Sequence, residues 1–121
     1  MARTGALATA LPARIAALPA IVEQAGTAAH TAWRDFFSGK LPNDYTRAAY
    51  AHAVRRFLVW CENTGHRELH RITPGDLGDY FRQHTGALAT KKQHLSGIRR
   101  FFNLLVERHL CLINPAAAVA L

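Results

Sequence analysis

The sequence predicts an all-α fold, a bundle of four to five helices joined by short loops. In several long stretches apolar residues recur every three or four positions, which is the periodicity of a helix with one buried face. No stretch alternates between apolar and polar residues for long enough to form a β-strand. Half of the 121 residues are hydrophobic, so a single packed domain is feasible at this length.

Residues 1–25 are expected to form a flexible arm outside the bundle. The arm is rich in alanine, and Pro12, Arg14 and Pro19 interrupt its apolar run. A secretory signal needs a continuous apolar region, so the arm is not expected to be a targeting sequence. One or two weak helical turns are expected here. The helical domain is expected to span residues 26–115.

The first two helices of this domain are bounded by turn residues. Residues 27–37 are good helix formers, and Ser38-Gly39 follows them. Asn43 or Asp44 can cap a second, long helix, which is expected to end at Gly65 in a left-handed conformation. Four residues spaced at helical intervals form the apolar stripe of this long helix: Tyr50, Val54, Phe57 and Cys61.

A short helix is expected over residues 75–84. Thr73 stands before Pro74 and three residues before Asp76, an arrangement close to a capping box in which Asp replaces Glu. Three apolar residues of the short helix are expected to be buried: Leu77, Tyr80 and Phe81.

The last helix is expected from about Ala89 to Glu107. Asn114-Pro115 prevents its continuation, because a residue before proline is disfavoured in the α conformation. Residues 116–121 carry no capping or turn signal and are expected to begin a linker. Five residues form the buried arc of the last helix: Leu95, Ile98, Phe102, Leu105 and Val106.

Charge and cysteine content restrict the partners and the compartment. The 15 Lys and Arg residues exceed the 8 Asp and Glu residues, for a net charge of +7. Such an excess suits nucleic acid, an anionic membrane surface or an acidic protein. No apolar run reaches the roughly 18–20 residues of a membrane span. Cys61 and Cys111 are far apart, so a reducing cytosol is expected rather than a disulfide framework.

No motif for catalysis or metal binding stands out. The sequence lacks GxGxxG, P-loop and HExxH patterns. Cys61, His66 and His70 suggest zinc, but a structural zinc site usually needs four ligands, and the other cysteine is distant. A core cysteine with two loop histidines is the simpler interpretation. No catalytic residue, metal or cofactor is therefore expected.

Cations stand at the expected starts of both long helices, as Arg47 and as Lys91 with Lys92. A cation in this position opposes the helix macrodipole and costs a few tenths of a kcal/mol. Helix N-termini with free amides, a threonine hydroxyl and a lysine suit phosphate. Both starts also contain a threonine, Thr46 and Thr90. They are therefore candidate phosphate sites.

The stretch from Lys91 to Arg100 contains no acidic residue, so its outward face is a candidate polyanion surface. Arginine can contact phosphate oxygens or the guanine edge with a planar fork. Arg55 and Arg56, by contrast, lie opposite the apolar stripe of their helix and are interpreted as a solvated face. Nine candidate DNA-contacting residues result: Thr46, Arg47, Thr90, Lys91, Lys92, Gln93, His94, Arg99 and Arg100.

Three runs of sequence occur in a specific order: YTRAAYAHAVRRFLVWC, LHRITPGDLGDYF and ATKKQHLSGIRRFFNLLVERHLCLINPA. Together they resemble the N-terminal, SAM-like core-binding domain of the tyrosine recombinases, the phage-integrase family, over residues 28–119. The family often has Arg at the position of Gln93 and an aliphatic residue at that of Lys91. The matching positions are Thr46, Tyr50, Phe57 and Trp60, then Ile72, Thr73, Asp76 and Leu77, then Thr90, Leu95, Ser96, Ile98, Arg99, Phe101 and Phe102, and Asn114 with Pro115.

The resemblance implies a domain that clamps one face of duplex DNA opposite a larger C-terminal catalytic domain. That second domain carries the catalytic residues and is expected to begin where this chain ends, so no enzyme is expected here alone. The resemblance implies a cytoplasmic protein, prokaryotic or phage-derived and associated with the nucleoid. The isolated domain is expected to be monomeric, and tetrameric assembly of a full-length protein on DNA stays open. The implied DNA-facing residues are Thr46, Arg47, Thr90, Lys92, Gln93, His94 and Arg99.

Two alternatives stay open. A SAM-like helical domain can bind another protein, with its charge serving solubility or an acidic partner. A small all-α enzyme is the third possibility, for which no constellation of residues is found.

Overall fold

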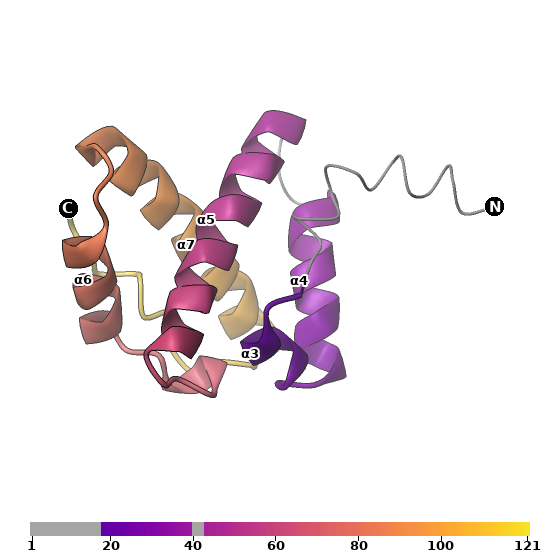
Figure 1. Ribbon diagram of the computed structural model, residues 1–121. Coiled ribbons are helices and arrows are strands. Elements are labelled where there is room, and N and C mark those ends of the chain that lie inside the picture. The colour runs from indigo at the N-terminus through magenta and orange to yellow at the C-terminus, as the bar shows by residue number, and fades with distance from the viewer. Residues whose placement is uncertain (1–17, 40–42) are drawn as a thin grey trace.

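The computed structural model describes residues 18–39 and 43–121, and every regular element in these ranges is a helix. The described residues form five α-helices and one short 3-10 helix (Figure 1). The prediction of an all-α bundle of four to five helices is confirmed. The elements are α3 (Ala20–Glu23), α4 (Thr27–Gly39), α5 (Asp44–Asn63), η1 (Leu69–Arg71), α6 (Pro74–Gln83) and α7 (Leu88–Glu107).

The long helices α5 and α7 form the centre of the bundle, with α4 on one side and α6 on the other (Figure 1). They cross where Gly97 faces Tyr50. A β-carbon added to Gly97 would lie 3.3 Å from Tyr50 Cα and 3.0 Å from the Tyr50 ring. Removing one large apolar side chain from water stabilises the fold by about 1.5–3 kcal/mol. The fully buried side chains of this pair include Val54, Phe57, Leu58, Ile98, Phe101, Phe102 and Leu105.

Helix α4 packs against α7 through aromatic rings. Trp33 and Phe36 both meet Phe101 edge to face, with ring centroids 5.7 and 5.5 Å apart. Such pairs add about 0.5–1.5 kcal/mol beyond the area that they bury. At the end of α7, the Arg108 guanidinium donates to Asp35 Oδ2 over 2.8 Å. These contacts hold α4 along the last turns of α7.

The expected arm, residues 1–25, needs correction at its end. Ile21 and Val22 of α3 are 1% and 0% exposed and belong to the main core. The Ile21 amide donates to the Glu62 carboxylate over 3.0 Å, which ties α3 to the end of α5. The helical domain therefore starts before residue 26. Residues 1–17 lie outside the described residues.

Three predicted caps are confirmed. Asn43 Oδ1 accepts from the Thr46 amide over 2.8 Å at the start of α5. Gly65 has a φ of 96°, the left-handed conformation expected after a helix. At the start of α6, the Asp76 amide donates to Thr73 Oγ1 over 3.2 Å, and the Thr73 amide donates back to Asp76 Oδ2 over 2.8 Å. This is a complete capping box.

Helix α7 begins one residue before the expected start and ends at Glu107 as predicted. The segment beyond it packs against the helix. Pro115 is fully buried and Ala116 is 0% exposed. The side-chain amide of Asn114 donates to the Arg99 carbonyl over 2.8 Å. Residues 116–119 therefore belong to the bundle, whereas the sequence predicted that a linker starts there.

Candidate nucleic-acid interface

The first turns of α5 and α7 lie at the same end of the bundle, the upper end in Figure 1. They do so because the two helices run in the same direction through their crossing at Tyr50 and Gly97. Candidate residues that are 43 to 46 positions apart in the chain thereby lie at the same end of the bundle. We call this region the basic end and define it by Thr46, Arg47, Thr90, Lys91 and Lys92.

The start of α7 is open to an anion. Its N-cap, Ala87, offers no side-chain acceptor, and the first turn contains no acidic residue. The first backbone bond of the helix runs from the Lys91 amide to the Ala87 carbonyl over 3.0 Å. Amides ahead of it have no intrahelical acceptor and give the helix start a partial positive charge. Thr90 and Lys92 are exposed beside this turn, and Lys91 is half-buried.

The start of α5 differs, because its own residues already occupy it. Asn43 caps the Thr46 amide, and Asp44 forms an ion pair with Arg47. Thr46 and Arg47 are both half-buried. A phosphate at this turn would therefore compete with Asp44 for the Arg47 guanidinium. Of the two helix starts, the start of α7 is the more accessible anion site.

Two further candidates on α7 are exposed, namely Gln93 and Arg100. Gln93 adjoins Lys92, so its amide extends the basic end with neutral donors and acceptors. Arg100 lies two turns further along the helix, away from the basic end.

The expectation that His94 points outward is wrong. His94 is 5% exposed, and its Nδ1 atom lies 2.9 Å from Nε2 of His84, which is 4% exposed. Burial, and then the positive charges of nearby groups, lower the pKa of His94 to about 4. At neutral pH the His94 ring is uncharged, and its Nδ1 atom is already engaged with His84. His94 therefore supports the α6–α7 turn from within.

Arg99 is likewise placed differently from the expectation. Its Nε atom donates to the Ala116 carbonyl over 3.0 Å, and Nη2 donates to the Val119 carbonyl over 2.6 Å. The guanidinium is half-buried under the segment that follows Pro115. Arg99 therefore fastens residues 116–119 to α7, and its fork is not available to phosphate while that segment is in place.

Arg56, interpreted from the sequence as part of a solvated face, is exposed and acts on the turn between α6 and α7. Burial lowers the pKa of His84, and the positive charges of Arg56 and Lys91 lower it further, in that order. Cations of α5 and α7 therefore act on the same ring. His52, one turn before Arg56, is exposed and lies beside His94 with ring centroids 5.9 Å apart. The four-residue spacing of His52 and Arg56 is the sequence signal that these two side chains lie on the same face of α5.

Two exposed apolar side chains adjoin the basic end. Tyr45 is 77% exposed in the first turn of α5, and Leu88 is 56% exposed at the first residue of α7. Aromatic rings next to cations can contact sugars or bases. Neither residue belonged to the sequence-derived set.

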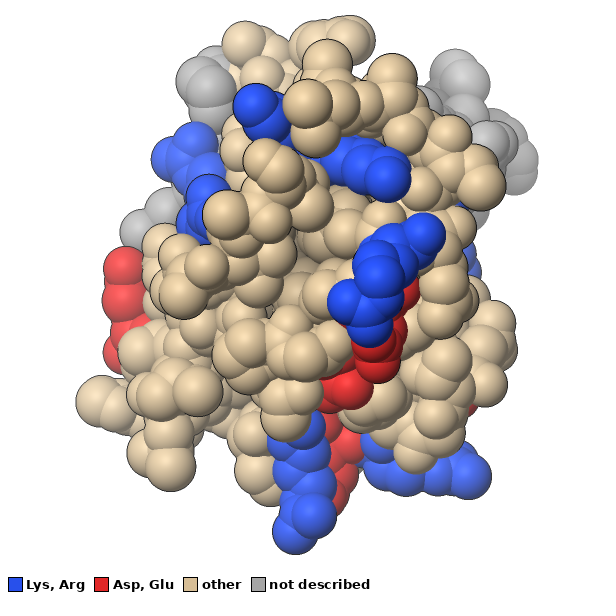
Figure 2. All heavy atoms as spheres, turned by 90° about the vertical axis from the view of Figure 1, so that its left-hand side faces the viewer, with Lys and Arg blue, Asp and Glu red and all other residues tan. Residues whose placement is uncertain are grey.

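Figure 2 shows the face of the bundle that carries α6. In its uppermost part, toward the end where α5 and α7 begin, the Lys and Arg side chains stand apart from carboxylates. In the lower part, Asp and Glu lie directly beside the basic side chains. On this face, the cations that stand apart from carboxylates therefore lie toward the end of the bundle where α5 and α7 begin.

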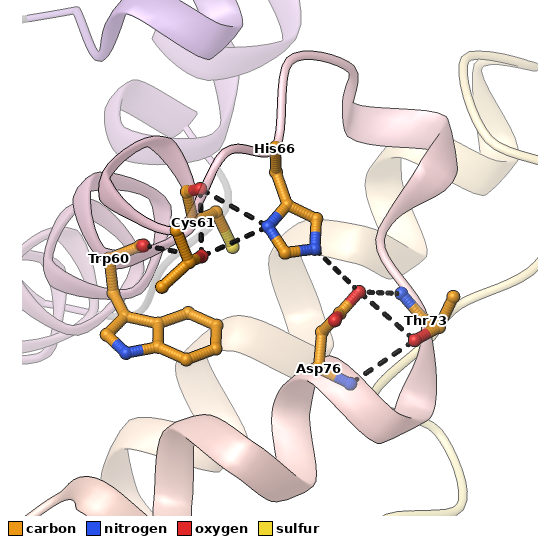
Figure 3. Close-up of polar contacts among 6 residues, drawn as sticks. Trp60, Cys61, His66, Thr73 and Asp76 are labelled. Carbon is orange, nitrogen blue, oxygen red and sulfur yellow. Dashed lines mark hydrogen bonds and ion pairs between the residues drawn. The ribbon is translucent and has the colours of Figure 1, made fainter.

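A second polar cluster lies at the opposite end of α5 (Figure 3). His66 Nε2 is 3.0 Å from Asp76 Oδ2, and His66 Nδ1 is 3.2 Å from the Cys61 carbonyl oxygen. Asp76 simultaneously serves the capping box of α6, and the His66 ring stacks on Trp60. The cluster links the end of α5 to the start of α6.

This cluster contains Cys, His and Asp but is not arranged as a thiol nucleophile. His66 contacts the carbonyl oxygen of Cys61 and not its thiol (Figure 3). Burial, followed by the charges of Asp76 and Glu62, raises the pKa of the Cys61 thiol well above its ordinary value. A neutral, buried thiol is a poor nucleophile. Over residues 18–39 and 43–121, no group of three or more His, Cys, Asp or Glu side chains is placed to hold a metal ion.

Comparison with known proteins gives no match to a family model, to a curated protein or to a solved structure. Among the described helices, none combines the length and the apolar character that a membrane span requires.

Proposed function

We propose that this chain is a duplex-DNA-binding module that contacts the phosphate backbone through its basic end. The observation that carries the proposal is the start of α7, which is uncapped, free of acidic residues and flanked by Thr90, Lys91 and Lys92. Backbone amides at a helix start and lysine side chains are the groups that bind phosphate in proteins. The net charge of +7 supports attraction to a polyanion.

The module serves a tyrosine recombinase or integrase, in our proposal. It clamps DNA for strand cleavage and rejoining by a C-terminal catalytic domain outside these 121 residues. The three motif runs and the order of the helices support this proposal. The proposed setting is the cytoplasm, for a prokaryotic or phage-derived protein that is associated with the nucleoid. The chain alone should leave supercoiled DNA intact. Nicking by a purified, nuclease-free preparation contradicts this part of the proposal.

A matched pair of double variants tests the interface. Lys91→Ala with Lys92→Ala should weaken duplex binding similarly for unrelated sequences and reduce the magnitude of the salt slope by about two. Arg67→Ala with Arg71→Ala removes the same charge near η1, where Arg71 pairs with Glu68. This control should change affinity much less. Fluorescence anisotropy with a labelled duplex measures both variants, and circular dichroism verifies their helicity.

Two outcomes contradict the assignment. Equal losses in both double variants would mean that net charge, and not the basic end, determines binding. Unchanged affinity in the lysine variant together with complete loss in Arg55→Ala would place the interface on the outer face of α5.

The alternative function is a helical protein–protein interaction domain. Leu112 and Ile113, just beyond α7, are 95% and 64% exposed, and adjacent exposed apolar side chains suit a protein partner. This function predicts no shift of a labelled duplex at low salt. Binding to a partner that is lost in Leu112→Ser with Ile113→Ser, and kept in the lysine variant, would favour it.

A further inference from the structure

The turn between α6 and α7 is held by a chain of two hydrogen bonds. His84 follows the last residue of α6, and its Nδ1 accepts from the Gly86 amide over 2.9 Å. The Nε2 atom of the same ring lies 2.9 Å from Nδ1 of His94 on α7. Both imidazoles are buried. The backbone of the turn is thus connected through one side chain to the second turn of the next helix.

The positions of the protons in this chain follow from the Gly86 amide. This amide can only donate, so His84 Nδ1 must carry a lone pair, and a neutral His84 carries its proton on Nε2. That proton is donated to His94, whose Nδ1 must also carry a lone pair. Both rings are therefore neutral when both bonds are made. A proton added to His84 Nδ1 faces the Gly86 N–H, and one added to His94 Nδ1 faces the His84 N–H.

The surroundings of the pair also disfavour a charged ring. Arg56 and His52 act on it from α5, and Lys91 acts on it from α7. Tyr80 and Phe81 of α6 pack against the His84 ring. None of these five side chains is a carboxylate that could offset an added charge.

Gly86 shows how tightly the turn closes on the ring. A β-carbon at this position would lie 2.6 Å from His84 Cε1 and 3.0 Å from Nδ1. Only a residue without a side chain lets the backbone amide approach the imidazole this closely. The hydrogen bond from the Gly86 amide to the His84 ring therefore depends on glycine at position 86.

We propose that His84 and His94 form a proton-sensitive latch, closed when both rings are neutral and opened by protonation, that holds the α6–α7 turn and the first turn of α7 in place. Opening breaks the bond to Gly86 or the bond between the rings, because either ring in its charged form needs acceptors where it now meets donors. The burial and the neighbouring cations that lower the pKa of both rings set the opening below the range of an ordinary histidine.

Hydrogen exchange of the Gly86 amide, measured with the imidazole resonances by NMR from pH 7 to pH 4, tests the latch. As the pair takes up a proton, the protection factor of the Gly86 amide should fall by about tenfold or more, while the amides of Val54 and Phe57 in α5 stay protected. Three results overturn the proposal. In the first, both buried rings titrate over the same pH range as the exposed His70. In the second, the Gly86 amide stays protected after the pair is protonated, and in the third, the α5 amides lose protection at the same pH as Gly86.

Two variants separate the latch from a general effect of acid. In His84→Asn, the introduced amide oxygen can accept from the residue-86 amide in an Asx turn and cannot be protonated in this range. Gly86 protection should then be independent of pH down to pH 4. His70→Asn removes an exposed histidine and should leave the wild-type loss unchanged. A pH-dependent loss in His84→Asn contradicts the latch. The test contains no DNA, so it stands or fails independently of the proposed function.

Discussion

At the scale of single residues, His94 couples stability to pH. Burial and neighbouring cations lower its pKa to about 4 in the folded protein, whereas an unfolded histidine has a pKa of about 6.5. Between these values the unfolded chain carries a proton that the closed folded state does not. The contribution of His94 to the free energy of unfolding is therefore fully present above about pH 6.5 and decreases as the pH drops toward 4.

This loss should reach on the order of 2–3 kcal/mol at pH 4 if the pair stays closed. Local opening lets the folded chain take up the same proton and makes the loss smaller. Urea unfolding at several pH values measures it. In His94→Asn the free energy of unfolding should depend less on pH, because only one of the two histidines with a lowered pKa remains. An identical pH dependence in variant and wild type would show that His94 contributes nothing to it.

Asp76 is expected to contribute more to stability than a neighbouring carboxylate. It closes the capping box with Thr73 and pairs with His66. Asp76→Ala should lower the free energy of unfolding by about 2 kcal/mol, because the helix cap and the interaction with His66 are lost together. Asp79→Ala, which removes a surface ion pair with Arg82, should cost about 0.5 kcal/mol or less. Comparable losses in chemical denaturation would contradict this ranking.

Residue-level prediction succeeded where the partners are close in the chain. The Thr73–Asp76 box could be predicted because its two members are three residues apart. His94 could not be placed, because its partner His84 lies ten positions away on another element. Arg99 is bound by two backbone carbonyls, and any residue type supplies these. Sequence pattern contains no signal for such an acceptor.

At the scale of helices, the crossing of α5 and α7 depends on Gly97. Glycine inside a helix costs about 1 kcal/mol relative to alanine, so it needs a packing reason. That reason is Tyr50, whose backbone Cα would be 3.3 Å from an added β-carbon. The close approach of the two helices at Gly97 helps to determine the positions of their first turns. It therefore also affects the geometry of the basic end.

Two glycine-to-alanine substitutions should therefore change the free energy of unfolding in opposite directions. Gly97→Ala should destabilise by about 1–3 kcal/mol, since the helices must move apart. Gly78 lies in α6, where a β-carbon would meet only the end of the Arg82 side chain at 3.6 Å. Gly78→Ala should stabilise by about 0.5–1 kcal/mol through helix propensity. Thermal and urea unfolding measure both. Stabilisation by Gly97→Ala would show that the crossing is loose.

Helix boundaries were predicted to within one or two residues for the long helices, because capping residues and apolar periodicity agree there. The single turn of α3 agrees with the weak helical turns expected in the arm, but its burial could not be predicted, because that burial depends on a hydrogen bond from the Ile21 amide to Glu62, 41 positions away. Helices α5 and α7 run in the same general direction, and this course places both candidate helix starts at the same end of the bundle. That course depends on tertiary packing and could not be read from the local pattern.

At the scale of the whole molecule, charge is concentrated and not merely abundant. Several basic residues are paired with carboxylates in their own helix turn, as Arg71 is with Glu68 and Arg82 with Asp79. The first turn of α7 contains no such carboxylate. A polyanion is therefore expected to approach the upper end of the bundle first, and to do so less readily as salt screens the field.

The dependence of duplex affinity on salt tests the central proposal most directly. Binding of the 121-residue chain to a labelled duplex is measured by anisotropy between low and physiological salt. Log K should fall linearly with log salt at about 0.9 per neutralised phosphate, for a slope of about −2 to −4 from the cations of the basic end and their neighbours. A flat dependence, or no binding at low salt, would contradict DNA binding by this domain.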